Sequence, residues 1–364
     1  MTDFSSPIQF GELKLKNRVV MAPLTRSRAT RDRVPTPMMV EYYAQRASAG
    51  LIIAEATVIS EEANGYEYTP GLFTDAQVEG WKPITQAVHD KGGLIVSQLW
   101  HVGRVSHPDL LNGETPVSAS AVKQAGHVSL LRPKREFVEP RPLEIAEIHA
   151  ITEQYKQAAI RAKQAGFDGV ELHAANGYLI DQFLQSKTNL RDDIYGGSVE
   201  NRARFLLEVV DALIEVWGAG RVGVHLAPRG DEHDMGDVNP RETFGYVLEE
   251  LGKRHIAFFF TREYLADDSI STELKQRSGN RVPYIANMRL SRQDALDLLS
   301  SGKADAVAFG KAYIANPDLY ERLVQDAPLN ELRLENMIGS QVAEGYTDYP
   351  FLAELVEQAE YFLI

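Results

Sequence analysis

The sequence predicts an α/β fold, a (β/α)8 TIM barrel with a short N-terminal hairpin and a long loop insertion after the third barrel strand. Two observations support this prediction: eight short apolar runs alternate with longer amphipathic stretches, and polar residues follow several of the runs. A chain of 364 residues fits one such barrel with insertions as well as it fits two domains, so length does not decide. We expect a single domain over residues 1–364.

Strands are expected where a β-branched or aromatic run is short and bounded by polar residues or glycine. These runs span residues 18–22, 51–54, 94–98, 167–172, 222–226, 256–260, 282–285 and 306–309. Helical periodicity lies between them, and one helix begins well because Ser291 is a good N-cap with Asp294 three residues on. The predicted helices span residues 38–49, 75–91, 143–165, 199–217, 240–253, 291–300 and 318–325.

Two further segments complete the predicted barrel. The connection over residues 101–142 contains Pro, Gly and Ser throughout and has little helical period, so we expect a lid or a substrate wall there rather than a second domain. Before residue 18, apolar residues alternate at Ile8, Phe10 and Leu13. This segment is expected to form the hairpin that closes the bottom of the barrel.

Composition limits the class of protein. Hydrophobic residues make up 44% of the chain, enough for a large core. A formal charge of −13 argues against nucleic acid or an anionic membrane as a partner. The absence of cysteine excludes disulfides, thiolate zinc sites and cysteine-bound iron–sulfur clusters. The chain has no apolar run of membrane length and a polar N-terminus, so we expect a cytoplasmic protein.

Polar residues gather at the expected C-terminal ends of the strands, where barrels of this type build their active sites. They are Thr25, Gln98, His101, His173, Asn176 and His225. This agreement between two independent features favours an enzyme.

The end of the fourth strand carries the most informative pattern. His173 and Asn176 lie three residues apart, and Tyr178 follows two residues later. A neutral His and an Asn each offer an N–H donor that can hold a carbonyl or nitro oxygen, and a Tyr nearby is a weak acid. A metal site is a poor alternative because Asn is a weak ligand and no carboxylate shares the motif. The pattern predicts reduction of a polarised double bond.

Seven motifs in one order resemble those of the Old Yellow Enzyme family, the NADH:flavin oxidoreductases and ene-reductases that include N-ethylmaleimide reductase-like proteins. They cover residues 17–26, 97–104, 173–183, 194–202, 306–310, 314–318 and 343–350. The resemblance runs from about residue 7 to residue 350, nearly the whole chain.

This resemblance implies a barrel that binds FMN and reduces activated alkenes with electrons from NADPH or NADH. By motif position, it implies that Tyr178 donates the proton while His173 and Asn176 hold the substrate oxygen. It assigns flavin contacts to Pro23, Leu24, Thr25, Ala56, Gln98 and Gly310, and the substrate pocket to Tyr66, Trp100 and Arg141.

The chain departs from the family pattern at two places. In the family, the fifth strand usually ends with an Arg that faces the flavin, and here His225 takes that position. Arg is always charged, whereas an unperturbed His side chain becomes charged only as the pH falls through about 6.5. The usual glycine-rich phosphate loop reads Ala286 to Leu290, and Lys311 stands where Arg is common. Two interpretations stay open: the side chains of Arg289 and Lys311, with Asn287 in the same loop, bind the phosphate, or the cofactor site has decayed.

The leading hypothesis is an NAD(P)H-dependent FMN ene-reductase for enones, maleimides or nitro compounds. The alternative is a flavin-free or weakly flavin-binding relative that binds a ligand without redox chemistry. A dienoyl-CoA reductase-like enzyme is excluded because such enzymes carry a cysteine-bound cluster and a further domain. We expect a monomer or homodimer whose partner is a small molecule with an activated alkene or nitro group.

Overall fold

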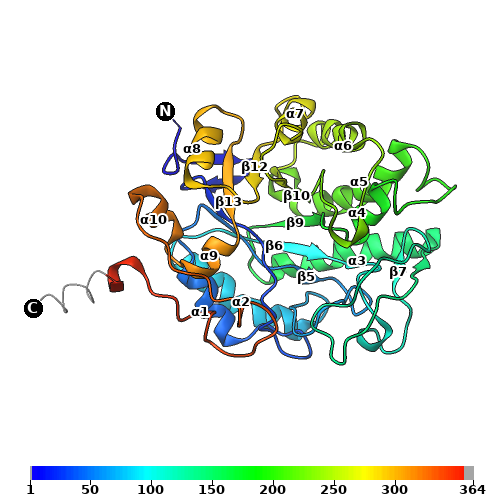
Figure 1. The fold of residues 1–364 in the computed structure, drawn as a ribbon, viewed down its shortest axis with the longest axis horizontal. Helices are drawn as coiled ribbons and strands as arrows, with labels where there is room; N and C mark the ends of the chain where they lie inside the picture. Colours follow the sequence, from blue (N-terminus) through cyan, green and yellow to red (C-terminus); the bar gives the residue numbers. More distant parts are fainter. Residues whose placement is uncertain (1, 356–364) are drawn as a thin grey trace, which may run out of the picture.

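The structure, a computed structural model that describes residues 2–355, contains a closed barrel of eight parallel strands surrounded by helices (Figure 1). Neighbouring strands follow the order β4-β3-β13-β12-β11-β10-β9-β6, and β6 pairs with β4 to close the circle. The strands are β3 (Val19–Met21), β4 (Leu51–Ile53), β6 (Ile95–Trp100), β9 (Gly169–Ala174), β10 (Val222–Leu226), β11 (Phe258–Arg262), β12 (Tyr284–Asn287) and β13 (Ala306–Phe309). All eight predicted strands and the fold class are confirmed.

The predicted helices are also present, with ends that differ by a few residues. They are α1 (Pro37–Gln45), α2 (Asp75–Asp90), α3 (Ile145–Gln164), α5 (Val199–Trp217), α6 (Pro240–Arg254), α8 (Arg292–Ser300) and α10 (Leu319–Gln325). Ser291 caps α8 as expected, because its side chain accepts from the backbone N–H of Asp294 and Asp294 bonds back to Ser291. Three short helices were not predicted: α4 (Leu179–Leu184), α7 (Ser271–Arg277) and α9 (Lys311–Ala315).

The connections carry small elements of their own. The N-terminal hairpin consists of β1 (Ile8–Phe10) and β2 (Leu13–Leu15), paired antiparallel as expected. Beyond β4, β5 (Thr57–Val58) pairs with the end of β6. The long connection after β6 contains a 3-10 turn, η1 (Pro108–Leu110), and a two-stranded sheet of β7 (Val117–Ser118) and β8 (Arg141–Pro142). Two further 3-10 turns flank β10, η2 (Ala219–Arg221) and η3 (Glu232–Asp234).

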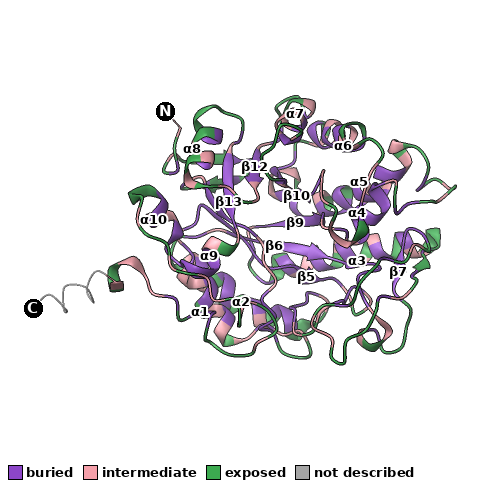
Figure 2. Ribbon diagram, in the orientation of Figure 1, coloured by how far each residue is buried: buried purple, intermediate pink, exposed green. Residues whose placement is uncertain are grey.

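Apolar side chains fill two separate layers, one inside the barrel and one between the barrel and its helices. In Figure 2 the strands of the barrel have the colour of buried residues. Phe10, Leu13 and Leu15 of the hairpin belong to the inner layer and close its lower end. The bulky run on β11 follows the strand alternation: Phe258 and Phe260 face the inside, while Phe259 faces outward and stacks on Tyr284 at 4.8 Å.

Gly223 on β10 makes room for this bulk. A Cβ atom added to Gly223 would lie 2.2 Å from Cζ of Phe258, far inside van der Waals contact. The ring of Phe258 therefore occupies the volume that a side chain at residue 223 would need. A small residue on one strand and a large one on its neighbour complete the same interior layer.

We expect Gly223→Val to lower the free energy of unfolding by about 1–3 kcal/mol, because the added methyl groups overlap the ring of Phe258. Shortening that ring in the double variant with Phe258→Leu should recover part of the loss. Urea unfolding of the wild type, both single variants and the double variant measures the coupling. If the losses in unfolding free energy of the two single variants simply add in the double variant, Phe258 does not limit the space at residue 223.

Beyond α10 the chain returns to the loop that follows β3, where buried arginines hold it. We call residues 336–346 the C-terminal segment; in Figure 1 it lies in the orange-to-red part of the ribbon. Arg26 donates from Nε to the carbonyl of Met337 at 2.7 Å and from Nη2 to the carbonyl of Gly345 at 2.8 Å. Arg28 donates to the carbonyl of Asn336 at 2.6 Å. Both guanidinium groups are buried, so these carbonyls satisfy donors that water cannot reach.

Candidate active site

Four polar side chains form one layer inside the C-terminal end of the barrel: Gln98 on β6, Glu171 and His173 on β9, and His225 on β10. Strand pairing places His225 opposite His173 and Gln98 opposite Glu171. Nε2 of Gln98 donates to Oε1 of Glu171 at 2.7 Å and lies 3.0 Å from Nδ1 of His225. Because an amide nitrogen only donates, Nδ1 of His225 accepts, and the neutral ring carries its proton on Nε2.

The imidazole rings of His173 and His225 are stacked, with centroids 5.1 Å apart and planes 5° from parallel. Burial, assisted by the charge of Arg262, lowers the pKa of His173 to about 3. Burial, then His173 and Arg262, lowers the pKa of His225 well below its ordinary value. Both rings are therefore neutral at pH 7. An unperturbed His side chain would take up a proton near pH 6.5, but His225 takes one up only at much lower pH.

The side chain of Glu171 is also mostly uncharged at neutral pH. Burial raises the pKa of its carboxyl group to about 8, although the hydrogen bond from Gln98 acts in the opposite direction. The ring of Phe260 lies 4.4 Å from that of His225 and covers the layer from β11. The barrel thus presents an amide, a carboxylic acid and two neutral imidazoles.

Tyr178 lies beside this layer, at the N-cap of α4. Its ring centroid is 5.0 Å from that of His173 and 5.0 Å from that of Trp100, and both contacts are edge-on. The hydroxyl groups of Tyr178 and Tyr66 are hydrogen-bonded at 2.9 Å, and the ring of Tyr66 stacks on Trp100. Burial raises the pKa of Tyr178 well above its ordinary value, so its phenol keeps its proton at neutral pH. The sequence-predicted residues His173, Tyr178, Tyr66 and Trp100 are thus brought together.

Asn176 sits at the turn that follows β9, in the left-handed region with a φ of 58°. Its side-chain Oδ1 accepts a hydrogen bond from Nη1 of Arg262 at 3.1 Å, and its backbone carbonyl lies 2.6 Å from Nδ1 of His233. Sequence reasoning did not single out Arg262. The signal was present, because Arg262 ends a barrel strand as several of the other site residues do.

Several buried polar atoms in this region have no hydrogen-bond partner within the described part of the chain. They are Nδ1 of His173, Nε2 of His225, Nε1 of Trp100 and Oε2 of Glu171. Buried polar groups in folded proteins are ordinarily paired, so a group of unpaired ones at one strand end indicates a polar ligand.

The remaining residues predicted for the cofactor surround the neighbouring strand ends. Pro23, Leu24 and Thr25 follow β3 and are partly exposed, and Ala56 is buried after β4. A Cβ atom added to Gly310, after β13, would lie 3.2 Å from the side chain of Leu24, so the loops after β3 and β13 meet.

The loops after β12 and β13 carry the predicted cations. Asn287 donates from Nδ2 to the carbonyl of Ala308 at 2.8 Å, which ties the two strand ends together. Met288 and Arg289 both adopt positive φ, at 104° and 54°. Arg289 and Lys311 are exposed, and over residues 2–355 neither side chain forms a hydrogen bond or ion pair. Two free cations at adjacent strand ends can accept an anionic group.

Arg141 lies apart from this cluster. It is exposed on β8, and its guanidinium forms two hydrogen bonds of 2.8 Å with the carboxylate of Glu147. It lines a surface cavity of about 430 Å³ together with Glu61, Glu62 and Glu114. Among the described residues it has no hydrogen bond with His173, Asn176 or Tyr178, so its role in substrate binding stays a prediction.

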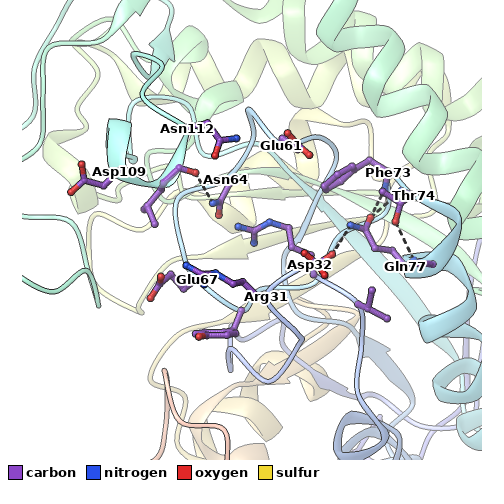
Figure 3. A pocket seen from close by; sticks show the side chains of 15 residues that line it. Arg31, Asp32, Glu61, Asn64, Glu67, Phe73, Thr74, Gln77, Asp109 and Asn112 are labelled. Carbon is purple, nitrogen blue, oxygen red and sulfur yellow. Dashed lines mark hydrogen bonds between the residues drawn. The ribbon is translucent and has the colours of Figure 1, made fainter.

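A second cavity, of about 570 Å³, lies beside the loop that carries Tyr66 (Figure 3). Its lining includes Arg31, Asp32, Glu61, Glu67 and Asp109, charges of both signs. Arg33, also in the lining, donates from Nη1 to the carbonyl groups of Tyr66 and Thr69 at 3.2 and 3.1 Å, and so fixes the base of the Tyr66 loop. None of the sequence-predicted site residues lines this cavity within the part of the chain that the structure describes.

Two kinds of feature are absent from residues 2–355. No helix there is long and apolar enough to cross a membrane. No group of three or more His, Asp or Glu side chains in that range is arranged to hold a metal ion.

Comparison with known proteins agrees with this geometry. A family model described as the NADH:flavin oxidoreductase / NADH oxidase family matches residues 4–330. A putative 12-oxophytodienoate reductase 2 of Oryza sativa subsp. japonica is 41% identical, over 97% of this chain and 95% of that protein.

Solved structures agree as well. The old yellow enzyme homologue from Zymomonas mobilis superposes with a TM-score of 0.93 at 45% identity, covering 96% of this chain and 99% of that one. Morphinone reductase in complex with tetrahydroNAD gives a TM-score of 0.91 at 47% identity, covering 97% and 98%. With a barrel, a strand-end site and relatives that match 96% or more of its length, this chain belongs to the Old Yellow Enzyme family of NADH:flavin oxidoreductases.

Proposed function

We propose that the protein is an NAD(P)H-dependent ene-reductase that uses FMN to reduce alkenes activated by a carbonyl or nitro group. The observation that carries this proposal is a neutral acid packed against a neutral imidazole donor at the end of β9, with an amide on the turn that follows. His173 and Asn176 are the donors, and the phenol of Tyr178, whose ring lies 5.0 Å from that of His173, is the acid.

The residues present fit FMN. Arg289 and Lys311 offer free positive charge for a phosphate, with the amide of Asn287 between the two strands. Leu24 and Thr25, partly exposed after β3, and the buried amide of Gln98 would meet the ring system. When bound, FMN supplies the hydride and takes up electrons from the nicotinamide.

The protein's own part in the reaction is to hold the substrate and to move one proton. A carbonyl or nitro oxygen that gains negative charge during reduction would accept hydrogen bonds from His173 and from Nδ2 of Asn176. Tyr178 would then give its hydroxyl proton to the substrate carbon next to that group. Trp100 and Tyr66 support this geometry, because Trp100 packs against the ring of Tyr178 and Tyr66 bonds its hydroxyl group.

We expect the purified protein to be yellow, with less than one FMN per chain that added FMN replenishes, because His225 provides no permanent cation near the flavin. Equilibrium dialysis against FMN, followed by assays of NADH and NADPH oxidation with 2-cyclohexenone and N-ethylmaleimide, tests both parts of the proposal. Absence of flavin binding at any concentration would contradict the enzyme and would favour the ligand-binding alternative. Binding without alkene-dependent oxidation would contradict the proposed reaction.

A further inference from the structure

Arg262, at the C-terminal end of β11, reaches across the mouth of the barrel to the turn that carries Asn176. Its Nη1 donates to Oδ1 of Asn176 at 3.1 Å, and the same guanidinium forms an ion pair with Glu232. About a third of the Arg262 side chain is exposed, at 31%, and that of Glu232 is exposed to 30%. The contact therefore lies at a partly sheltered edge of the site.

Glu232 is itself held in place by the loop that contains η3. His233 follows it, and the carbonyl of His233 accepts from Nη2 of the buried Arg104 at 2.6 Å. Asp234 accepts from the backbone N–H of Ala125 at 2.6 Å. Nη1 of Arg262 thus lies between two acceptors, the carboxylate of Glu232 on this held loop and Oδ1 of Asn176.

The contact decides which way the amide of Asn176 points. An amide has an acceptor oxygen and a donor nitrogen of almost equal size, so its orientation follows from its neighbours. A guanidinium group only donates, so it selects Oδ1 and turns Nδ2 away. Within the described residues Nδ2 of Asn176 has no hydrogen-bond partner of its own. The backbone cannot swing to change this, because the carbonyl of Asn176 is held by His233.

We propose that Arg262 is a positioning residue that keeps Asn176 in the donor orientation toward the substrate oxygen. This inference rests on the proposed function, since it explains how Asn176 serves as a donor. Without Arg262, the amide could present Oδ1 to an oxygen that is becoming negative, which would repel it. An anion-binding role for Arg262 itself is less favoured, because Glu232 already neutralises its charge.

The test compares Arg262→Met, Asn176→Ala and the double variant, all saturated with FMN. Loss of a hydrogen bond to a charged group corresponds to a decrease of about 10- to 100-fold, so Arg262→Met and Asn176→Ala should each lower kcat for alkene reduction by that factor. The double variant should be no slower than Asn176→Ala, since Arg262 acts only through Asn176. Effects that multiply would overturn the proposal and indicate a direct action of the charge.

A binding measurement separates this inference from the proposed reaction. The probe is 4-nitrophenol, whose phenol and phenolate forms absorb at different wavelengths, so its spectrum reports how well the site stabilises an oxyanion without turnover. We expect Arg262→Met to shift the bound probe toward the neutral phenol as far as Asn176→Ala does. An unshifted spectrum in Arg262→Met would overturn the inference, even where the wild type reduces alkenes. A wild type that binds the phenolate without alkene reduction would contradict only the proposed function.

Two further variants control for folding and for charge. Arg262→Lys keeps a side chain that only donates, so it should retain most of the oxyanion preference, and it serves if Arg262→Met does not fold. Glu232→Gln removes the ion pair but leaves Arg262 free to bond Asn176, so its bound-probe spectrum should resemble that of the wild type. The proposed orientation of the amide would be contradicted if Arg262→Lys bound as little phenolate as Arg262→Met. A strong shift of the bound-probe spectrum in Glu232→Gln would contradict it as well.

Discussion

Tyr178→Phe is expected to slow alkene reduction on the order of 100-fold or more, while the reduction of bound FMN by the nicotinamide changes little. Only the first of these half-reactions requires a proton for carbon, and the high pKa that burial gives Tyr178 keeps that proton available. Stopped-flow absorbance at the flavin band follows each half-reaction separately. An equal loss in both would mean that Tyr178 acts by packing against His173 and Trp100.

Tyr66→Phe is the matched control for this experiment. It removes the hydroxyl group that bonds Tyr178 at 2.9 Å but leaves the ring that stacks on Trp100. The proton donor itself stays in place, so the loss in alkene reduction should be much smaller than in Tyr178→Phe. Similar losses in the two variants would point to the pair of hydroxyl groups, rather than Tyr178 alone, as the source of the proton.

His225→Arg is expected to tighten FMN binding by about tenfold and to raise the reduction potential of the flavin, because a permanent cation would face the electron-rich side of the ring. Glu171, with Oε1 3.8 Å from Nδ1 of His225, is near enough to accept a hydrogen bond from the new guanidinium group. Dissociation constants measured by fluorescence quenching of FMN, together with redox titration, check both effects. His225→Gln is the control, since it can bond Gln98 without adding charge.

The pH dependence of these constants gives a second criterion. Burial holds the pKa of His225 well below its ordinary value, so the wild type gains no cation as the pH falls from 8 to about 6. Titration of the FMN phosphate affects all variants alike, so the ratio of wild-type to His225→Arg constants should stay flat over this range. Equal constants for His225→Arg and His225→Gln would show that residue 225 does not face the flavin.

The barrel strands could be predicted because each is a short apolar run, and parallel strands buried on both faces leave that signal in the sequence. The three missed helices are only five to seven residues long, too short to show a clear period. The sequence did not explain why β11 carries three consecutive phenylalanines. The structure does so for Phe258, because its ring fills the space left by Gly223, which has no side chain and lies on another strand.

The site divides in the same way. His173, Asn176 and Tyr178 lie within six residues on one strand end, so spacing alone could connect them. The bond between Arg262 and Asn176 joins residues 86 positions apart, and the acid–amide–imidazole contacts of Glu171, Gln98 and His225 join three strands. Such pairs depend on barrel register, which no local pattern specifies. The pKa values of Glu171, His173 and His225 depend mainly on burial, so they could not be predicted from the sequence either.

The C-terminal segment sets the length of the unit that folds. The family model ends its match at residue 330, yet Arg26 and Arg28 find their acceptors at residues 336, 337 and 345. A chain cut at residue 330 would keep every barrel strand but lose these carbonyls and the ring of Tyr346, over which both guanidinium groups lie, so any donor that stayed buried would be unpaired. Unpaired buried donors and charges are among the most destabilising defects a protein can carry. The smallest independent folding unit therefore extends at least to residue 345, past the boundary that sequence matching draws.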